Sequence, residues 1–150
     1  MNRVAVLVPL LVGCIAIGCT IVIHGAALAA NLYFVRHEQA LGRTGVSFWI
    51  DLMIVTIALL LALLAHLIAI GLWAILLVLC GEFQAFELAF YHSAMNYTSL
   101  GYGDIVMSPA WKLLGPIEAV DGLLMFGVST AMVFAVIQRL VQTRFPDLRP

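Results

Sequence analysis

The residues with the clearest potential chemistry form the stretch Thr98-Ser99-Leu100-Gly101-Tyr102-Gly103-Asp104. Gly101 and Gly103 have no Cβ and can adopt positive φ. The backbone conformation can then alternate between left-handed and right-handed along the loop, so that successive carbonyl groups point to the same side. A ring of such backbone carbonyls can replace the hydration shell of an ion. Asp104 would then cap the loop and add negative charge at its mouth. The stretch is therefore a candidate for an ion-coordinating loop, of which each chain supplies one copy, and the alternative is an ordinary glycine turn between two membrane helices.

The composition around this loop is that of a membrane protein. Of the 150 residues, 64% are hydrophobic and only 10% are charged, too few charges to cover a soluble domain. Three stretches, 4–35, 52–81 and 122–138, contain no Asp, Glu, Lys or Arg. A spanning helix needs about 20 residues, so each stretch can cross once, the third with flanking residues. The net charge of −1 makes nucleic acid an unexpected partner.

The expected elements place the loop between two spans. A first helix runs from about residue 4 to at least 23, and a polar connector follows from 36 to 45. After a short interfacial segment at 47–51, a second helix covers about 53–80 and ends at Gly81. Residues 82–97 would make a helix of only ~24 Å, shorter than the ~30 Å hydrocarbon core. This half-helix is therefore expected to be re-entrant, and a third span follows at about 116–140.

This order of outer helix, half-helix, Gly-Tyr-Gly loop and inner helix resembles that of potassium channels, whose filter is usually written T-V-G-Y-G-D. The resemblance covers roughly residues 53–140 and is greatest to small prokaryotic ion channels related to two-pore-domain subunits, in the pore-loop superfamily. It implies an all-α membrane protein with three transmembrane helices, a re-entrant pore helix and a selectivity filter. It further implies a homotetramer that conducts K⁺, with K⁺ as its permeant ligand, no cofactor and no enzymatic chemistry.

The resemblance also assigns roles within the loop. In the family the filter carbonyls and one side-chain hydroxyl bind the ions, and here Ser99 holds the place of the threonine that supplies this hydroxyl. Leu100 replaces the usual valine, and Tyr102 favours potassium selectivity, since related non-selective channels carry Asp there. The implied ion-binding residues are Thr98, Ser99, Leu100, Gly101, Tyr102 and Gly103, with K⁺ held at Ser99, Leu100, Gly101 and Tyr102.

Four further residues are expected to support the filter. The Tyr102 hydroxyl is expected to reach the pore-helix positions of Tyr91 and His92, as it reaches aromatic residues in the family. Several family members have a carboxylate that pairs with the loop aspartate, but Met95 occupies that position here. Asp104 should therefore bind Tyr91, His92 or water. Gly122 and Gly127 are candidates for a gating hinge, or for close helix packing.

The domain organisation and topology follow from the charges. We expect an extra helix and connector at 1–45, a pore domain at 46–142 and a tail at 143–150. By the positive-inside rule, the side holding most arginines is cytoplasmic, which places the C-terminus inside and the N-terminus outside the cell membrane. The first helix is interpreted as a retained span rather than a cleaved signal, and no voltage sensor is expected. The arginines on the cytoplasmic side are Arg36, Arg43, Arg139, Arg144 and Arg149, against Arg3 and Lys112 outside.

Two other functions remain open at this stage. One is a non-conducting subunit that regulates another channel. The other is an intramembrane aspartyl protease of the G-x-G-D type, with Asp51 as a second carboxylate beside Asp104. His66 in the second helix is either functional or a neutral imidazole bonded between helices. Five acids are expected near the outer side, as a cation-attracting ring or as ordinary helix-end charges: Glu82, Glu87, Asp104, Glu118 and Asp121.

Overall fold

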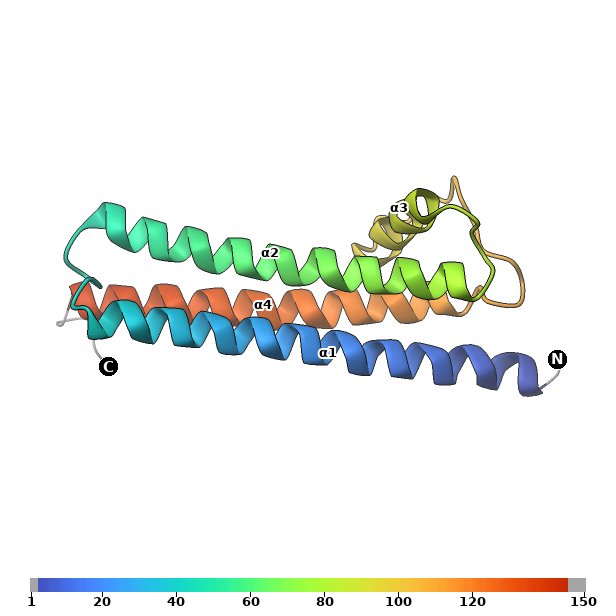
Figure 1. The fold of residues 1–150 in the computed structure, drawn as a ribbon, viewed down its shortest axis with the longest axis horizontal. Coiled ribbons are helices and arrows are strands. Elements are labelled where there is room, and N and C mark those ends of the chain that lie inside the picture. Colours follow the sequence, from blue (N-terminus) through green and yellow to red (C-terminus); the bar gives the residue numbers. More distant parts are fainter. Residues whose placement is uncertain (1–2, 146–150) are drawn as a thin grey trace. The chain divides into compact units, whose positions relative to one another are not determined.

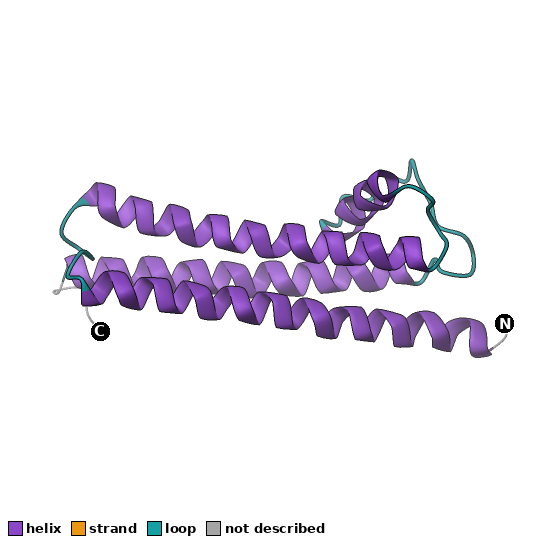
Figure 2. Cartoon of the chain, in the orientation of Figure 1, coloured by secondary structure: helices purple, strands orange, loops and turns teal. Residues whose placement is uncertain are grey.

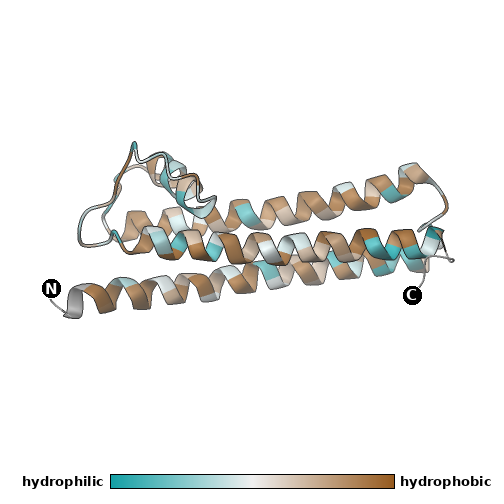
Figure 3. Cartoon of the chain, turned by 180° about the vertical axis from the view of Figure 1, so that it is seen from behind, coloured by the Kyte–Doolittle hydropathy of each residue, from teal (hydrophilic) through white to brown (hydrophobic). Residues whose placement is uncertain are grey.

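The computed structural model describes residues 3–145, which form four α-helices and no β-strand (Figures 1 and 2). Arg149 and the end of the predicted tail lie outside the described residues. Three of the helices are long and apolar enough to cross a membrane, and hydrophobic residues predominate along each of them (Figure 3). The predicted all-α membrane fold is confirmed. The helices are α1 (Arg3–Ala40), α2 (Phe48–Leu79), α3 (Phe86–Tyr97) and α4 (Leu114–Arg144).

The long helices extend further than their uncharged stretches. With 38, 32 and 31 residues, α1, α2 and α4 would measure roughly 45–57 Å, well beyond the ~30 Å hydrocarbon core. The first part of the predicted connector is the end of α1, because no glycine or proline lies between residue 36 and Gly42, where φ is +67°. The predicted interfacial segment around Trp49 is likewise the first turn of α2.

The half-helix is shorter than predicted. Helix α3 has 12 residues and begins at Phe86, so Glu82 lies before it in the loop that follows α2. There the Glu82 carboxylate accepts hydrogen bonds from the Ser108 backbone N–H at 2.7 Å and from the Ser108 hydroxyl at 2.5 Å. Glu82 therefore joins the loop before α3 to the loop before α4, instead of sitting in the first turn of the pore helix.

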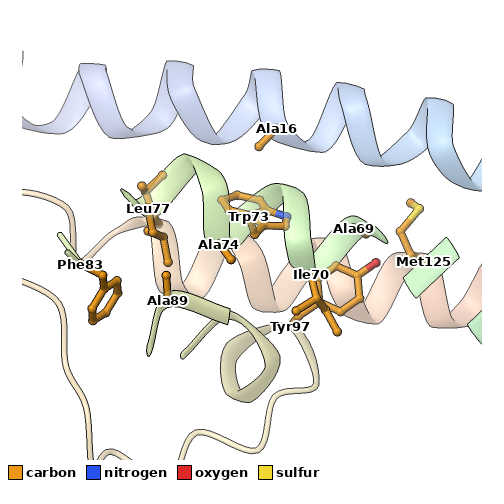
Figure 4. Close-up of a cluster of buried hydrophobic side chains, with 11 residues drawn as sticks. Ala16, Ala69, Ile70, Trp73, Ala74, Leu77, Phe83, Ala89, Tyr97 and Met125 are labelled. Atoms are coloured by element: carbon orange, nitrogen blue, oxygen red, sulfur yellow. The ribbon is translucent and has the colours of Figure 1, made fainter. Parts of the chain in front are cut away.

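The chain divides into two compact units. Unit 1 comprises Met1–Ile23 and His66–Phe126 and contains α3 together with the candidate loop. Its core includes the fully buried side chains of Trp73, Leu77 and Tyr97 (Figure 4). Parts of α1, α2 and α4 contribute to this core, so the loop lies on a scaffold built from all four helices.

Unit 2 comprises His24–Ala65 and Gly127–Pro150 and contains the connector between α1 and α2. It has a separate apolar core, to which α1, α2 and α4 each contribute at least one residue. The buried members are Val35, Ile54, Ala58, Val136 and Leu140.

Candidate functional site: the Gly-Tyr-Gly loop and its support

The loop after α3 has an alternating backbone. Ser99, Gly101 and Gly103 have φ values of +60°, +53° and +74°, whereas Leu100 and Tyr102 are not among the residues with positive φ. Such alternation turns successive carbonyl groups toward the same side of the chain, which is the geometry that ion coordination by carbonyls requires. The two glycines were expected to adopt positive φ. Ser99 was not, because a non-glycine residue is uncommon in this region and its side chain gives no signal for it.

The inner end of the loop is held by the last turn of α3. The Thr98 hydroxyl donates to the Ala94 carbonyl at 2.6 Å, so it is turned back onto its own helix. The Gly101 N–H donates to the Met95 carbonyl at 3.1 Å. Met95 has no carboxylate to offer, but its backbone still anchors the middle of the loop.

The outer end of the loop is held by a side chain of α3. The Tyr91 hydroxyl donates to Asp104 Oδ2 at 2.8 Å, and Tyr91 is one of the three partners, with His92 and water, that were expected for this aspartate. The hydrogen bond to the carboxylate raises the pKa of Tyr91. Tyr102, in contrast, is 69% exposed, and its hydroxyl makes no hydrogen bond within residues 3–145. The expected contact of Tyr102 with the pore helix is therefore not formed within one chain.

His92 connects α3 to the chain that leaves the loop. Its ring Nε2 lies 2.8 Å from Asn96 Nδ2, and the ring also bonds the Ile105 backbone, one residue after Asp104. Burial lowers the pKa of His92, against the raising effects of the Ile105 bond and of the Asp104 and Glu82 charges. A neutral imidazole can both accept from the Asn96 amide and donate to the Ile105 carbonyl.

Asp121 is fully buried and joins three helices of unit 1. Its Oδ1 accepts a hydrogen bond from the Thr20 hydroxyl of α1 at 2.8 Å, and its Oδ2 accepts one from the Trp73 indole N–H of α2 at 2.9 Å. The interpretation of Asp121 as a mouth or helix-end charge is therefore wrong. The available signal was its position in an otherwise apolar spanning helix, where a carboxylate needs buried partners.

Glu118, one turn before Asp121, is also fully buried, so it is not an exposed charge at the mouth either. Neither carboxylate oxygen has a partner in hydrogen-bonding geometry among residues 3–145, although Ser93 and Asn96 of α3 lie beside it. Asn96 thus lies between Glu118 on α4 and His92, whose ring bonds the Ile105 backbone. A row of polar side chains runs from α4 through α3 to the end of the loop.

Close packing also links α4 to the start of the loop. A Cβ on Gly122 would lie 1.9 Å from the Tyr97 carbonyl oxygen, so only glycine fits where α4 meets the end of α3. A Cβ on Gly127 would meet nothing within 4 Å. His66 stacks on Phe126 with ring centroids 4.2 Å apart, and its Nδ1 lies 3.5 Å from the Tyr97 hydroxyl, which makes it a contact between helices.

The two aspartates of the protease alternative have other partners. Asp51 accepts a hydrogen bond from the Gly45 N–H at 2.9 Å and pairs with Arg144 at 3.5 Å. Asp104 binds Tyr91, as described above. Within the described part of the chain, no group of three or more His, Cys, Asp or Glu side chains could hold a metal ion. These contacts give no support to a pair of carboxylates that share a proton.

Comparison with known protein families agrees with a loop that could coordinate ions. A family model described as "Ion channel" matches residues 65–139, half of the chain. The matched segment begins within α2, contains α3 and the Gly-Tyr-Gly loop, and ends within α4. Helix α1 lies outside it. No match was found among the curated proteins or among the solved structures.

Proposed function

The chain belongs to this family of ion channels, and we propose that it is the subunit of a potassium-selective pore. Its three apolar helices make it a multi-pass membrane protein. The observation that carries the proposal is the alternation of positive φ at Ser99, Gly101 and Gly103, within a Gly-Tyr-Gly loop that follows a short helix. Backbone carbonyls turned to one side are suited to K⁺, because they can replace its water shell without a charged side chain.

In this mechanism ions pass in single file, and no covalent bond changes. The carbonyl groups of Ser99, Leu100, Gly101 and Tyr102 hold K⁺, and the Ser99 hydroxyl contributes at the innermost site. Three contacts support the rigidity that selectivity needs. They are the Gly101–Met95 backbone bond, the Tyr91–Asp104 bond and the His92–Ile105 bond.

We infer a homotetramer with the loops around a four-fold axis, because one loop cannot surround an ion. In the single chain Leu100 and Tyr102 are 54% and 69% exposed, which leaves both side chains available to a neighbouring copy. The partner that Tyr102 lacks would then come from another subunit. The detergent-solubilised complex should have the mass of four chains. A monomer or dimer that still conducts would contradict this arrangement.

Orientation follows the positive-inside rule, with the C-terminus in the cytoplasm and the N-terminus outside. Cysteine accessibility on either side of the membrane tests it, with one cysteine placed at Lys112 and another at Arg43, in a variant that lacks the three native cysteines. The Lys112 position should react with an impermeant reagent added outside intact cells, whereas the Arg43 position should not. The reverse result would invert the topology.

Ion flux into liposomes that contain purified protein tests selectivity. K⁺ and Rb⁺ should enter and Na⁺ should largely not. Tyr102→Asp should relax this preference, because related non-selective filters differ at that position. Equal permeability of Na⁺ and K⁺ in the unmodified protein would refute the proposal, and no flux at all would favour a regulatory subunit.

Ser99→Ala tests the innermost site by itself. The substitution removes the hydroxyl and keeps the carbonyl, so conductance and internal barium block should weaken while the tetramer stays intact. A variant that behaves like the unmodified protein in both measurements would place the Ser99 side chain outside the ion path.

Met95→Glu tests the support behind the filter. Met95 and Asp104 line the same cavity of about 380 Å³, so a glutamate could share a proton with Asp104 there. The change should alter the decay of current after opening. Asp104→Asn should then have a larger effect in the Met95→Glu background than in the native one, and equal effects would show that the two positions are not coupled.

A further inference from the structure

The arginines of unit 2 fall into two groups. Arg43 lies 3.6 Å from the Glu38 carboxylate, and Arg144 lies 3.5 Å from Asp51. Arg36 and Arg139 are exposed and have no carboxylate within ion-pair distance among residues 3–145. Two positive charges near the ends of α1 and α4 are therefore not neutralised by the described chain.

Both of these arginines line the same groove. On the α1 side the groove is formed by Leu28, Leu32 and Val35, which lead along one face of the helix to Arg36. Leu28, Leu32 and Arg36 are four residues apart from one to the next, and this spacing keeps their side chains on one face of the helix. Helix α4 matches this pattern, and its apolar residues Met132, Ala135 and Val136 lead to Arg139. The result is a narrow apolar groove of about 150 Å³ that ends in two guanidinium groups.

A polar space continues from the charged end of the groove. It has a volume of about 390 Å³ and is lined by Gln39, Thr44, Arg139, Gln142 and Thr143. Gln39 and Arg139 also line the apolar groove, so the two spaces adjoin. Within the described part of the chain, no carboxylate lines either space. The groove is therefore apolar at first and ends at two positive charges, and the adjoining polar space is lined by uncharged side chains apart from Arg139.

The lengths of α1 and α4 favour a position of this arrangement at headgroup depth. Helices α1 and α4 are longer than the hydrocarbon core is thick, and each arginine is within about two turns of the end of its helix. The same unit carries Trp49, which is 74% exposed in the first turn of α2. Exposed tryptophans in membrane proteins concentrate at the interface between headgroups and hydrocarbon.

We propose that the ends of α1 and α4 bind an anionic phospholipid. Part of one acyl chain lies in the apolar groove, the phosphate lies between Arg36 and Arg139, and a hydroxylated headgroup extends into the polar space. Guanidinium groups bind phosphate through paired hydrogen bonds, and two of them without an acidic neighbour favour a lipid with net negative charge over a zwitterionic one. The site is separate from the filter residues, and its occupancy does not depend on ion conduction.

Native mass spectrometry of the purified complex tests the site with phosphatidylglycerol and phosphatidylcholine as probes. Phosphatidylglycerol should be retained more strongly. Arg36→Gln and Arg139→Gln should each weaken its binding about fivefold, the equivalent of about 1 kcal/mol per arginine near an anionic headgroup, and the double variant should lose the preference. Unchanged binding in the double variant would overturn the proposal.

Arg144→Gln is the matched control, because it removes one positive charge from the same end of α4. Arg144 is already paired with Asp51, so its loss should leave phosphatidylglycerol binding unchanged. An equal loss in Arg144→Gln and Arg139→Gln would show attraction to net charge alone and would also overturn the proposal.

Two further measurements separate a lipid from a soluble anion. Glycerol 3-phosphate has the same phosphate chemistry without acyl chains, and it should not displace phosphatidylglycerol at millimolar concentration. Ala135→Phe should fill the apolar groove and weaken phosphatidylglycerol binding while both arginines remain. Displacement by glycerol 3-phosphate, together with normal lipid binding by Ala135→Phe, would identify a site for a soluble anion and reject the lipid site.

Discussion

The two compact units draw on the same three long helices but use polar groups differently. In unit 1, buried side chains join elements far apart in the sequence, as Asp121 does with Thr20 and Trp73. In unit 2, the long-range ion pair is that of Asp51 and Arg144. The buried polar side chains of this unit, His24, Asn31 and Glu38, all lie on α1, and the cluster of buried side chains to which α1, α2 and α4 contribute is apolar. Polar contacts that position a functional loop depend on single atoms, whereas apolar packing tolerates change more readily.

The difference has a physical origin in what each unit must hold. A loop with positive φ at three alternating positions cannot be stabilised by helix hydrogen bonds, so side chains from neighbouring helices must fix it. The Tyr91–Asp104 bond and the His92 contacts do this in unit 1. Unit 2 contains regular helix and a short connector, and its buried polar side chains, His24, Asn31 and Glu38, all lie on α1.

The largest expected effect is that of Gly122→Ala in unit 1. The new methyl group would overlap the Tyr97 carbonyl oxygen, so α4 must move away from α3, at a cost of at least about 3 kcal/mol in the free energy of unfolding. The methyl group of Gly127→Ala meets no atom within 4 Å, so the free energy of unfolding of this variant should stay within about 1 kcal/mol of that of the unmodified protein. Equilibrium unfolding in mixed detergent micelles measures both. Similar costs would remove the contrast between the two glycines.

A smaller effect is expected for Asp121→Ala, at about 2 kcal/mol, because the Trp73 indole N–H and the Thr20 hydroxyl both lose a buried acceptor. Thr20→Val removes only the contact with α1 and should cost about 1 kcal/mol. The same unfolding measurement applies. Asp51→Ala in unit 2 is the comparison, and a cost as large as that of Asp121→Ala would contradict the distinction between the units.

A pH effect is also expected in unit 1. Because the folded-state pKa of His92 is lowered, the folded protein binds fewer protons than the unfolded chain below the ordinary histidine pKa of about 6.5. Stability should therefore be complete above that pH and fall as the pH drops toward the folded-state pKa. His92→Gln should reduce the slope of the melting temperature against pH between pH 8 and pH 5.5. His37→Gln, at an exposed position on α1, should leave this slope unchanged. An unchanged slope in His92→Gln would refute this assignment.

The smallest expected effect is the coupling between Asp51 and Arg144. The two charged groups are 3.5 Å apart, and the Arg144 side chain is 35% exposed against 13% for Asp51. Screening by water and salt at the exposed partner should keep the coupling below about 1 kcal/mol. A double-mutant cycle with Asp51→Asn and Arg144→Gln, at low and high salt, measures it. A coupling of several kcal/mol, or one that ignores salt, would mean that unit 2 also depends on a specific polar contact.

Hydropathy and short motifs by themselves determined the architecture. The three uncharged stretches predicted three spans, and the length of the segment before Thr98 predicted a half-helix, because span length depends only on the thickness of the bilayer. The Gly-Tyr-Gly-Asp motif identified the loop, since positive φ at glycine is a local property. The positions at which helices end were predicted less accurately. The charged residues near the end of α1 permit helix as readily as coil, so α1 continues to Ala40.

The tertiary structure alone decided how the loop is supported. Periodicity cannot show which helices pack against each other, so Glu118 and Asp121 were interpreted as charges at the outer mouth or at a helix end. In the structure Glu118 is buried beside Ser93 and Asn96. Asp121 is buried against Thr20 and Trp73. The contact of Gly122 with Tyr97 has the same origin, because it depends on where α3 ends relative to α4. Local sequence determines which segments are apolar and which can turn, whereas burial and partner choice arise only when distant segments pack together.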